Sequence, residues 1–289
     1  MLRNSLRQVG GLAALVACLF MGGCVGMDRN ERADTLAASA GLKREQIATD
    51  AFVLTAFVRV TRPDAPIDVY IEGDGLAWIS RTEPSLDPTP REPTGLALAA
   101  VDPAPNVAYI ARPCQYSPMS ENPRCAVAYW TDKRFSSEVV SAMNAAVDQI
   151  AARAPGQPVN LTGYSGGGAI AVLLAAQRRD IGLLRTVAGN LDDEYVNAIH
   201  HVSPMPGSLN PIDFASRVGA LAQVHFSGAD DTIVPPEVAR RFVAAEGGAK
   251  CVDVQLVAHM THGGEWQQQW PRLLSVAPSC MTSADTHAH

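Results

Sequence analysis

Apolar and polar positions along the chain follow two different periods. Seven apolar, β-branched runs of strand length begin at residues 51, 67, 106, 159, 184, 223 and 252. Between several of them lie longer segments with the helical period, at residues 136–153, 167–179, 235–247 and 265–276. Strands that alternate with helices are typical of a mostly parallel sheet that carries helices on both faces. We therefore predict an α/β fold of this kind.

Local signals add detail to this pattern. Ser136 is a helix-cap candidate, with Glu138 close behind it. Pro271 lies inside the last helical segment, so we expect that helix to kink or to end there. Residues 82–95 and 200–214 are rich in proline and predict two long loops, the kind of segment that often carries function.

The N-terminus has the pattern of an export signal. Arg3 and Arg7 precede an apolar run, and small residues precede Cys24. The run is short and weakly flanked for a membrane-spanning helix. The letters MGGC that end at Cys24 resemble the lipobox of bacterial lipoproteins, in which the cysteine is lipidated. We predict a lipoprotein signal peptide over residues 1–23; a plain signal peptide is the alternative.

The expected domain boundaries follow from this N-terminus. Residues 24–47 are polar and charged, and fit a tether or a short helix between anchor and domain. Residues 48–280 have the length of one large domain, and residues 281–289 have the composition of a disordered tail. The residue after Cys24 is Val25 and not aspartate. By the resemblance to bacterial lipoproteins, this favours sorting of the protein to the outer membrane. We therefore expect an exported protein, lipid-anchored to the outer membrane of a Gram-negative bacterium.

The charge balance bears on the class of partner. The chain has 23 lysines and arginines against 29 aspartates and glutamates, a formal net charge of -6. Nothing in it resembles a basic surface for nucleic acid. We expect a membrane partner through the lipid anchor, and no nucleic-acid partner.

Four of the six cysteines follow the signal segment. An even number in an oxidising compartment suggests two disulfides. Three pairings are possible, and we favour Cys114 with Cys125 and Cys251 with Cys280, because each of these pairs is close in sequence. None of the pairs has C-x-x-C or zinc-ligand spacing, so we expect no metal site.

One glycine-rich stretch, VNLTGYSGGGAIAVLLAA, joins a predicted strand to a predicted helix. It contains Gly163, Tyr164, Ser165, Gly166 and Gly167, a G-x-S-x-G sequence. This resembles the nucleophile elbow of the α/β-hydrolases, in which a strained turn exposes the serine hydroxyl. Glycines around the serine avoid collisions with the helix and the neighbouring strand. A phosphate-binding turn fits poorly, because no lysine follows the serine.

A serine nucleophile needs a histidine base, and the base needs an acid to orient it. The resemblance implies the chain order Ser, Asp, His. The acid candidates, Asp230 and Asp231, follow the run that begins at residue 223. We favour Asp231, because Gly228 and Pro235 match the family pattern G-x-x-D-x-x-V-P; Asp230 is the alternate.

The base candidates, His259 and His262, follow the last predicted strand. The family's histidine often precedes a glycine and a nearby tryptophan, and His262 is followed by Gly263 and Trp266. We therefore favour His262 as the base, with His259 as the alternate.

The oxyanion of the intermediate needs hydrogen-bond donors. The resemblance implies the main-chain N–H of Gly166 as one donor. The stretch VYIEGDGLAW resembles the family's H-G-x-G loop and implies the N–H of Asp74 as the second, with Gly75 as the alternate. Glu72 stands where the family has a histidine. Whether this chain makes the hydrogen bonds with which that histidine supports the loop is therefore in question.

The resemblance extends over residues 51–277 and implies a serine hydrolase with an α/β-hydrolase fold, no metal and no organic cofactor. Cleavage of carboxylic esters is the expected reaction, and lipid or lysophospholipid esters suit an enzyme held at a membrane. A peptidase or acyltransferase with the same three residues, and a non-catalytic lipoprotein scaffold, are the alternatives. We expect residues 112–134, stiffened by Cys114 and Cys125, to form part of the pocket wall.

Overall fold

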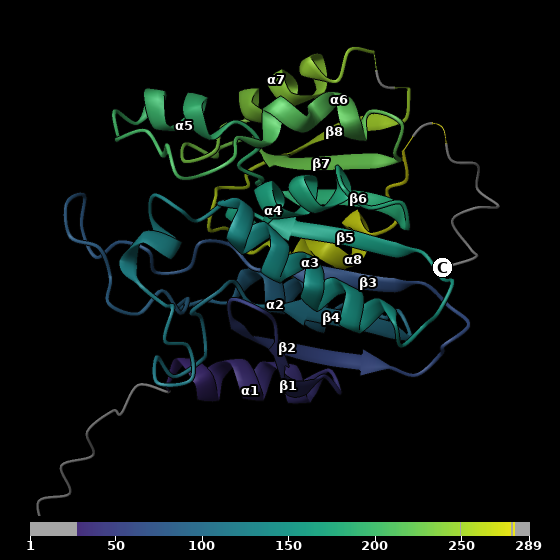
Figure 1. Ribbon diagram of the computed structural model, residues 1–289. Coiled ribbons are helices and arrows are strands. Elements are labelled where there is room, and N and C mark those ends of the chain that lie inside the picture. Colours follow the sequence, from purple (N-terminus) through teal and green to yellow (C-terminus); the bar gives the residue numbers. More distant parts are fainter. Residues whose placement is uncertain (1–27, 249, 279, 281–289) are drawn as a thin grey trace, which may run out of the picture.

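A computed structural model of the 289-residue chain describes residues 28–248, 250–278 and 280. Its centre is one eight-stranded sheet with the order β1-β2-β4-β3-β5-β6-β7-β8 (Figure 1). Strand β2 runs antiparallel to β1 and β4, and all pairs from β4 to β8 are parallel. The strands are β1 Lys43–Ala48, β2 Val53–Val60, β3 Ile67–Ile71, β4 Asn106–Ile110, β5 Val159–Tyr164, β6 Ile181–Val187, β7 Gln223–Gly228 and β8 Val252–Val257.

Helices cover both faces of this sheet (Figure 1). Apolar residues of α3, α4, α6 and α7 form the buried core on one face, and those of α1, α2 and α8 form the core on the other. The mostly parallel α/β architecture is therefore confirmed. The α-helices are α1 Arg29–Ser39, α2 Thr94–Ala100, α3 Ser137–Ala151, α4 Gly166–Ala175, α5 Asp193–Ile199, α6 Ala215–Val218, α7 Glu237–Ala245 and α8 Trp266–Leu273, with 3-10 turns at Val127–Trp130 and Pro211–Phe214.

The seven apolar runs correspond to β2 through β8. For the segment predicted as a tether or a short helix, the structure shows a helix, and it also shows an edge strand that was not predicted. From Arg29 onward this segment forms α1 and the edge strand β1, which pairs with β2. Only Ile47 of β1 is buried, so the strand lacks the apolar alternation that would have revealed it. The rest of the predicted tether, the signal peptide, Cys24 and residues 281–289 lie outside the described residues.

Two local helix signals have different outcomes. The side chain of Ser136 accepts a hydrogen bond from the N–H of Val139 (3.4 Å) and caps α3, as predicted. Helix α8 continues through Pro271 to Leu273, so of the two expected outcomes, a kink or an end at the proline, the end is wrong. Across the residues that the structure describes, none of the helices combines the length and the apolar character needed to cross a membrane.

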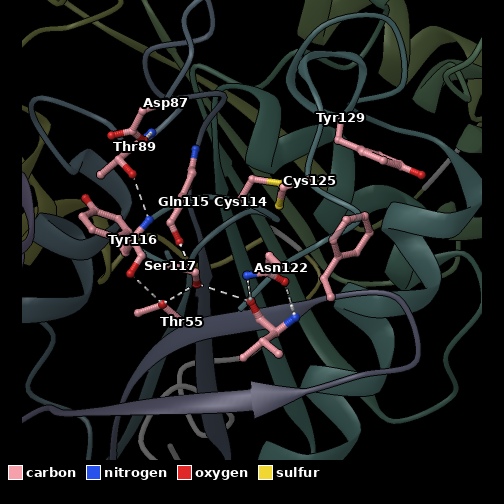
Figure 2. The surroundings of a disulfide bond; sticks show 12 residues. Thr55, Asp87, Thr89, Cys114, Gln115, Tyr116, Ser117, Asn122, Cys125 and Tyr129 are labelled. Carbon is pink, nitrogen blue, oxygen red and sulfur yellow. Dashed lines mark hydrogen bonds between the residues drawn. A yellow bond between two sulfur atoms is a disulfide. The ribbon is translucent and has the colours of Figure 1, made fainter. Parts of the chain in front are cut away.

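Both favoured disulfides are present, Cys114 with Cys125 and Cys251 with Cys280. The first closes part of the insert formed by residues 112–134, shown in Figure 2.

Hydrogen bonds hold this insert against the sheet and the proline-rich loop. The side chain of Asn122 bonds to the N–H and the carbonyl of Val53 in β2 (2.7 and 2.9 Å). The N–H of Tyr116 donates to the hydroxyl of Thr89 (2.9 Å). The insert is thus fixed to two neighbouring parts of the fold as well as by its disulfide.

The sheet brings distant parts of the sequence to one edge. Strands β3, β5, β7 and β8 are parallel and end at Ile71, Tyr164, Gly228 and Val257. The carboxyl ends of parallel strands lie at the same edge, where open α/β sheets bind ligands. Each of the four predicted site segments directly follows one of these strand ends.

Candidate active site

Ser165 lies in a strained turn between β5 and α4. Its backbone angles are φ 51° and ψ -120°, a region that residues with a side chain rarely adopt. Its N–H donates to the carbonyl of Val187 (2.9 Å), and its carbonyl accepts from Gly168 (2.9 Å) and Asn190 (3.0 Å). These bonds fix the backbone, and hence the position from which the hydroxyl projects.

The glycines around Ser165 are required by close backbone approach. A Cβ at Gly163 would overlap the carbonyl of Gly167, and a Cβ at Gly167 would overlap the carbonyls of Ile71 and Glu72 at the end of β3. At Gly168 a Cβ would lie 2.9 Å from the Cα of Gly189. The turn is therefore tightly packed on both sides, and substitution of these glycines would displace it.

The structure joins Ser165, His262 and Asp231 by hydrogen bonds. The Nε2 atom of His262 lies 3.0 Å from the Ser165 Oγ, and its Nδ1 lies 2.9 Å from the Oδ2 of Asp231. The carboxyl of Asp231 is fully buried, and its Oδ1 accepts from the N–H groups of Ile233 (2.8 Å) and Val234 (2.9 Å). Since a carboxylate only accepts, Nδ1 carries the proton and Nε2 can accept from the serine hydroxyl.

The two alternates, Asp230 and His259, do not reach Ser165. Their side chains are 59% and 97% exposed, and lie 3.9 Å apart from one another. Adjacent side chains in the turn point in different directions, so Asp231 faces the imidazole of His262 while Asp230 faces solvent.

The main-chain carbonyl of His262 is held by two donors. The hydroxyl of Tyr164 and the indole N–H of Trp266 both donate to it, each over 3.0 Å. Tyr164 precedes Ser165, so this bond links the turn of the serine directly to the loop of the histidine. In the sequence, Trp266 is visible only as part of the pattern after His262. The role of Tyr164 is not visible there, because a contact across 98 residues leaves no local signal.

The predicted oxyanion loop lies against Ser165. A Cβ on Gly73 would lie 3.3 Å from the Cβ of Ser165. On the far side of Gly73, the side-chain amide of Gln115 donates to its carbonyl (3.0 Å). At the alternate donor Gly75 the backbone has φ 65°, and a Cβ would overlap the carbonyl of Pro88. Asp74 is thus held between two glycines whose backbones are tightly constrained.

Glu72 holds this loop to the start of α2. Its buried carboxylate accepts four hydrogen bonds, from the N–H groups of Gly73 (3.0 Å), Gly95 (3.1 Å) and Leu96 (3.4 Å) and from the hydroxyl of Tyr109 (3.0 Å). Burial raises the pKa of Glu72, and these hydrogen bonds act in the opposite direction. The residue that replaces the family's histidine therefore has its own anchoring bonds.

The side chain of Asp74 has partners that the sequence analysis missed. Arg112 and Arg134 form ion pairs with its carboxylate at 3.3 and 3.0 Å. The same carboxylate lies where a Cβ on Gly166 would fall, so it is next to the first residue of α4. The insert supplies both arginines, one from each end, and their distance along the chain hid the pair.

Within residues 28–248, 250–278 and 280, no cluster of three or more histidine, cysteine, aspartate or glutamate side chains could hold a metal ion.

Comparison with solved structures identifies the fold. An esterase from Pyrococcus furiosus matches with a TM-score of 0.57 at 12% identity, over 80% of this chain and 90% of that one. Est1E from Butyrivibrio proteoclasticus matches with a TM-score of 0.53 at 14% identity, over 80% and 97% of the two chains. No protein-family model matches the sequence, and no curated protein sequence matches it either.

A third solved structure, a Mycobacterium tuberculosis puromycin-hydrolyzing peptidase, is much longer. It matches over 81% of this chain but only 38% of its own, with a TM-score of 0.57 at 15% identity. These likenesses and the eight-stranded sheet show that the chain has an α/β-hydrolase fold.

Proposed function

We propose that this protein is a serine hydrolase that cleaves carboxylic esters through an acyl-enzyme on Ser165. The observation that carries the proposal is the row of hydrogen bonds from Asp231 through His262 to Ser165. A binding scaffold has no physical need for an activated serine, a correctly oriented imidazole and a buried carboxylate in one row.

In the first half-reaction the Ser165 Oγ attacks the carbonyl carbon while His262 Nε2 accepts the hydroxyl proton. Asp231 stabilises the imidazolium that forms, and its own position is fixed by two main-chain donors. The N–H groups of Gly166 and Asp74 bind the oxyanion. Collapse of the intermediate breaks the bond to the alcohol, which leaves with the proton from His262.

In the second half-reaction water attacks the acyl-enzyme. His262 accepts a proton from the water, and the Ser165 Oγ leaves and takes that proton back. The carboxylic acid is released and the serine hydroxyl is restored. Ser165 itself is half-buried, although the glycines on both sides of it are buried, so water and substrate can reach the serine.

The structural neighbours include esterases and a puromycin-hydrolyzing peptidase. They support hydrolysis in general. A peptidase or acyltransferase would use the same three residues, and we retain both as alternatives to the esterase. The sequence-based preference for lipid or lysophospholipid esters, and the lipid anchor at Cys24 in an outer membrane, are likewise proposals. A panel of acyl chain lengths and metabolic labelling with a fatty acid test them.

A fluorophosphonate probe tests the central claim. We expect it to label the wild type and not Ser165→Ala, and we expect short-chain aryl esters to be hydrolysed only by the former. Absence of labelling in the folded wild type would contradict the proposal.

The chain provides matched pairs of residues that test the other assignments. His262→Ala should abolish turnover, whereas His259→Ala should leave it intact, because the side chain of His259 is exposed to solvent. Asp231→Asn should lower kcat by several orders of magnitude, since the neutral amide no longer fixes the imidazole tautomer. Asp230→Asn should have little effect. The reverse pattern in either pair would reassign that role.

A further inference from the structure

A charged cluster lies beside the first residue of α4. It consists of Asp74, Arg112 and Arg134, in which the Nη1 atoms of the two arginines lie 3.3 and 3.0 Å from different oxygens of the carboxylate. The carboxylate of Asp74 packs directly against the Cα of Gly166, the residue after Ser165, so that a Cβ on Gly166 would overlap it. The two guanidinium groups are therefore close to the carbonyl that Ser165 would attack.

Both arginines retain donors that the cluster does not use. The side chains of Arg112 and Arg134 are only 5% and 14% exposed. Arg112 also donates through Nη2 to the carbonyl of Arg134. The Nε atoms of both are buried and have no hydrogen-bond partner among the described residues. Buried donors without partners are energetically unfavourable, so these two N–H groups favour a ligand that accepts hydrogen bonds.

Only one carboxylate compensates the two arginines at close range. The guanidinium groups of Arg112 and Arg134 share Asp74, and within the described residues no other carboxylate lies within 4.0 Å of either. Glu72 acts electrostatically on Arg112 and Asp193 acts on Arg134, both from beyond ion-pair distance. Burial raises the pKa of Asp193 to about 7, so this carboxyl is only partly ionised near neutral pH.

The surroundings make the cluster a rigid one. The ring of Phe135 is buried, and both guanidinium groups lie 5.3 Å from its centre. The disulfide between Cys114 and Cys125 constrains the insert from which both arginines come. A preformed pair of guanidinium groups recognises the planar, doubly accepting carboxylate better than other side chains can.

We propose that the natural substrate is an ester that carries a carboxylate, which binds Arg112 and Arg134 beside Ser165. This rests on the proposed function and narrows it from esters in general to anionic ones. The cluster also places a polar, charged wall where a long apolar chain would otherwise lie, which disfavours a lipid acyl group on this side of the serine.

Matched ester pairs test this inference. Monoethyl adipate and ethyl hexanoate have acyl chains of equal length and differ in one terminal carboxylate; 4-carboxyphenyl hexanoate and phenyl hexanoate place the same difference on the alcohol side. We expect the wild type to prefer the anionic member of at least one pair by about tenfold or more in kcat/KM, mainly through KM, as expected for charge-assisted hydrogen bonds. The pair that shows the preference identifies which half of the ester carries the charge.

Three variants assign such a preference to the cluster. Arg134→Gln should reduce the ratio of anionic to neutral kcat/KM to near one, and Arg134→Lys should retain part of it because the charge remains. Arg124→Gln is the matched control, since Arg124 belongs to the same insert but pairs with Glu138 at the surface, and it should keep the full ratio. Thermal melts identify any variant that fails to fold.

Free glutarate provides a second measurement that needs no variant. It should slow fluorophosphonate labelling of Ser165 in the wild type more than hexanamide does. Hydrolysis of the neutral esters without preference for the anionic ones, or a preference that survives Arg134→Gln, would overturn this inference and leave the serine hydrolase intact. Absence of both labelling and turnover would overturn the proposed function, and this inference with it.

Discussion

The hydroxyl of Tyr164 donates a hydrogen bond to the main-chain carbonyl of His262 over 3.0 Å. The residue before the serine thus positions the loop that carries the histidine, and the two rings lie 5.6 Å apart. Trp266 donates to the same carbonyl from the start of α8. Two donors from separate elements hold one carbonyl, so the imidazole approaches Ser165 from a defined direction.

Tyr164→Phe should lower kcat by about 2- to 10-fold, the rate equivalent of one net hydrogen bond. KM should change less, because the hydroxyl is used to position the histidine and has no contact with substrate. Steady-state kinetics corrected by active-site titration provide the measurement. Tyr129→Phe removes a hydroxyl that bonds to Glu138 at the surface and serves as control. Equal kcat values for Tyr164→Phe and wild type would show that Trp266 alone suffices.

The buried carboxylate of Glu72 leads to a second prediction. In Glu72→Gln an amide group would face N–H donors, so at least one of the four hydrogen bonds is lost and the oxyanion loop shifts. We expect kcat to fall by about tenfold or more, since one charge-assisted bond of 1.5 to 3 kcal/mol is removed close to an oxyanion donor. Tyr109→Phe removes one donor only and should have a smaller effect.

Kinetics per labelled serine separate positioning from stability in Glu72→Gln. A purely structural role would lower the melting temperature and the labelled fraction, and leave kcat per labelled Ser165 unchanged. A positioning role lowers kcat per labelled site even at temperatures where the variant is fully folded.

Local backbone requirements explain why the sequence predicted so much of this site. The glycines around Ser165 are enforced by backbone overlap within the same turn, and the chain order places Asp231 and His262 after parallel strands that end at one edge. Such features can be recognised from residues that are adjacent in the sequence. Arg112 and Arg134 do not, because their shared contact with Asp74 exists only after the insert has folded over the loop.

The same distinction applies to the fold. Buried strands such as β2, with the sequence VLTAFVRV, are rich in apolar and β-branched residues and could be predicted directly. The edge strand β1 has one buried side chain, and α1 contributes mainly alanines to the core, so neither has a strong apolar period. Their place in the domain is fixed by pairing with β2 and packing on the sheet, which are tertiary interactions.

The disulfide of the insert provides a third prediction. Cys114→Ser/Cys125→Ser should lose roughly 3 kcal/mol of unfolding free energy, as expected for closure of a loop of this size. It should also reduce the preference for anionic esters, because the insert supplies both arginines. Cys251→Ser/Cys280→Ser is the control: a stability loss of roughly 3 to 4 kcal/mol with an unchanged preference. An equal loss of preference in both double variants would point to a general effect of destabilisation.

Buried carboxyls give the protein a pH-dependent stability that can be assigned. Burial raises the pKa of Asp193 to about 7, well above the ordinary aspartate value of 3.8. Between these two values the folded state binds more protons at this site than the unfolded state, so the free energy of unfolding falls as pH rises. The contribution is fully present below about pH 4 and is lost as pH rises towards 7.

Asp193→Asn removes this titration. Relative to wild type, the variant should therefore gain unfolding free energy between pH 4 and pH 8. We expect a gain on the order of 2 kcal/mol, about half of what roughly three pKa units at 1.36 kcal/mol each would give without solvent screening. Urea unfolding at several pH values measures the difference. Asp50→Asn, at an exposed position, should follow the wild-type curve at all pH values. If the curves of Asp193→Asn and wild type ran parallel, the pKa of Asp193 would be the same in the folded and unfolded states, and Asp193 would compensate the charge of Arg134 more fully than we infer.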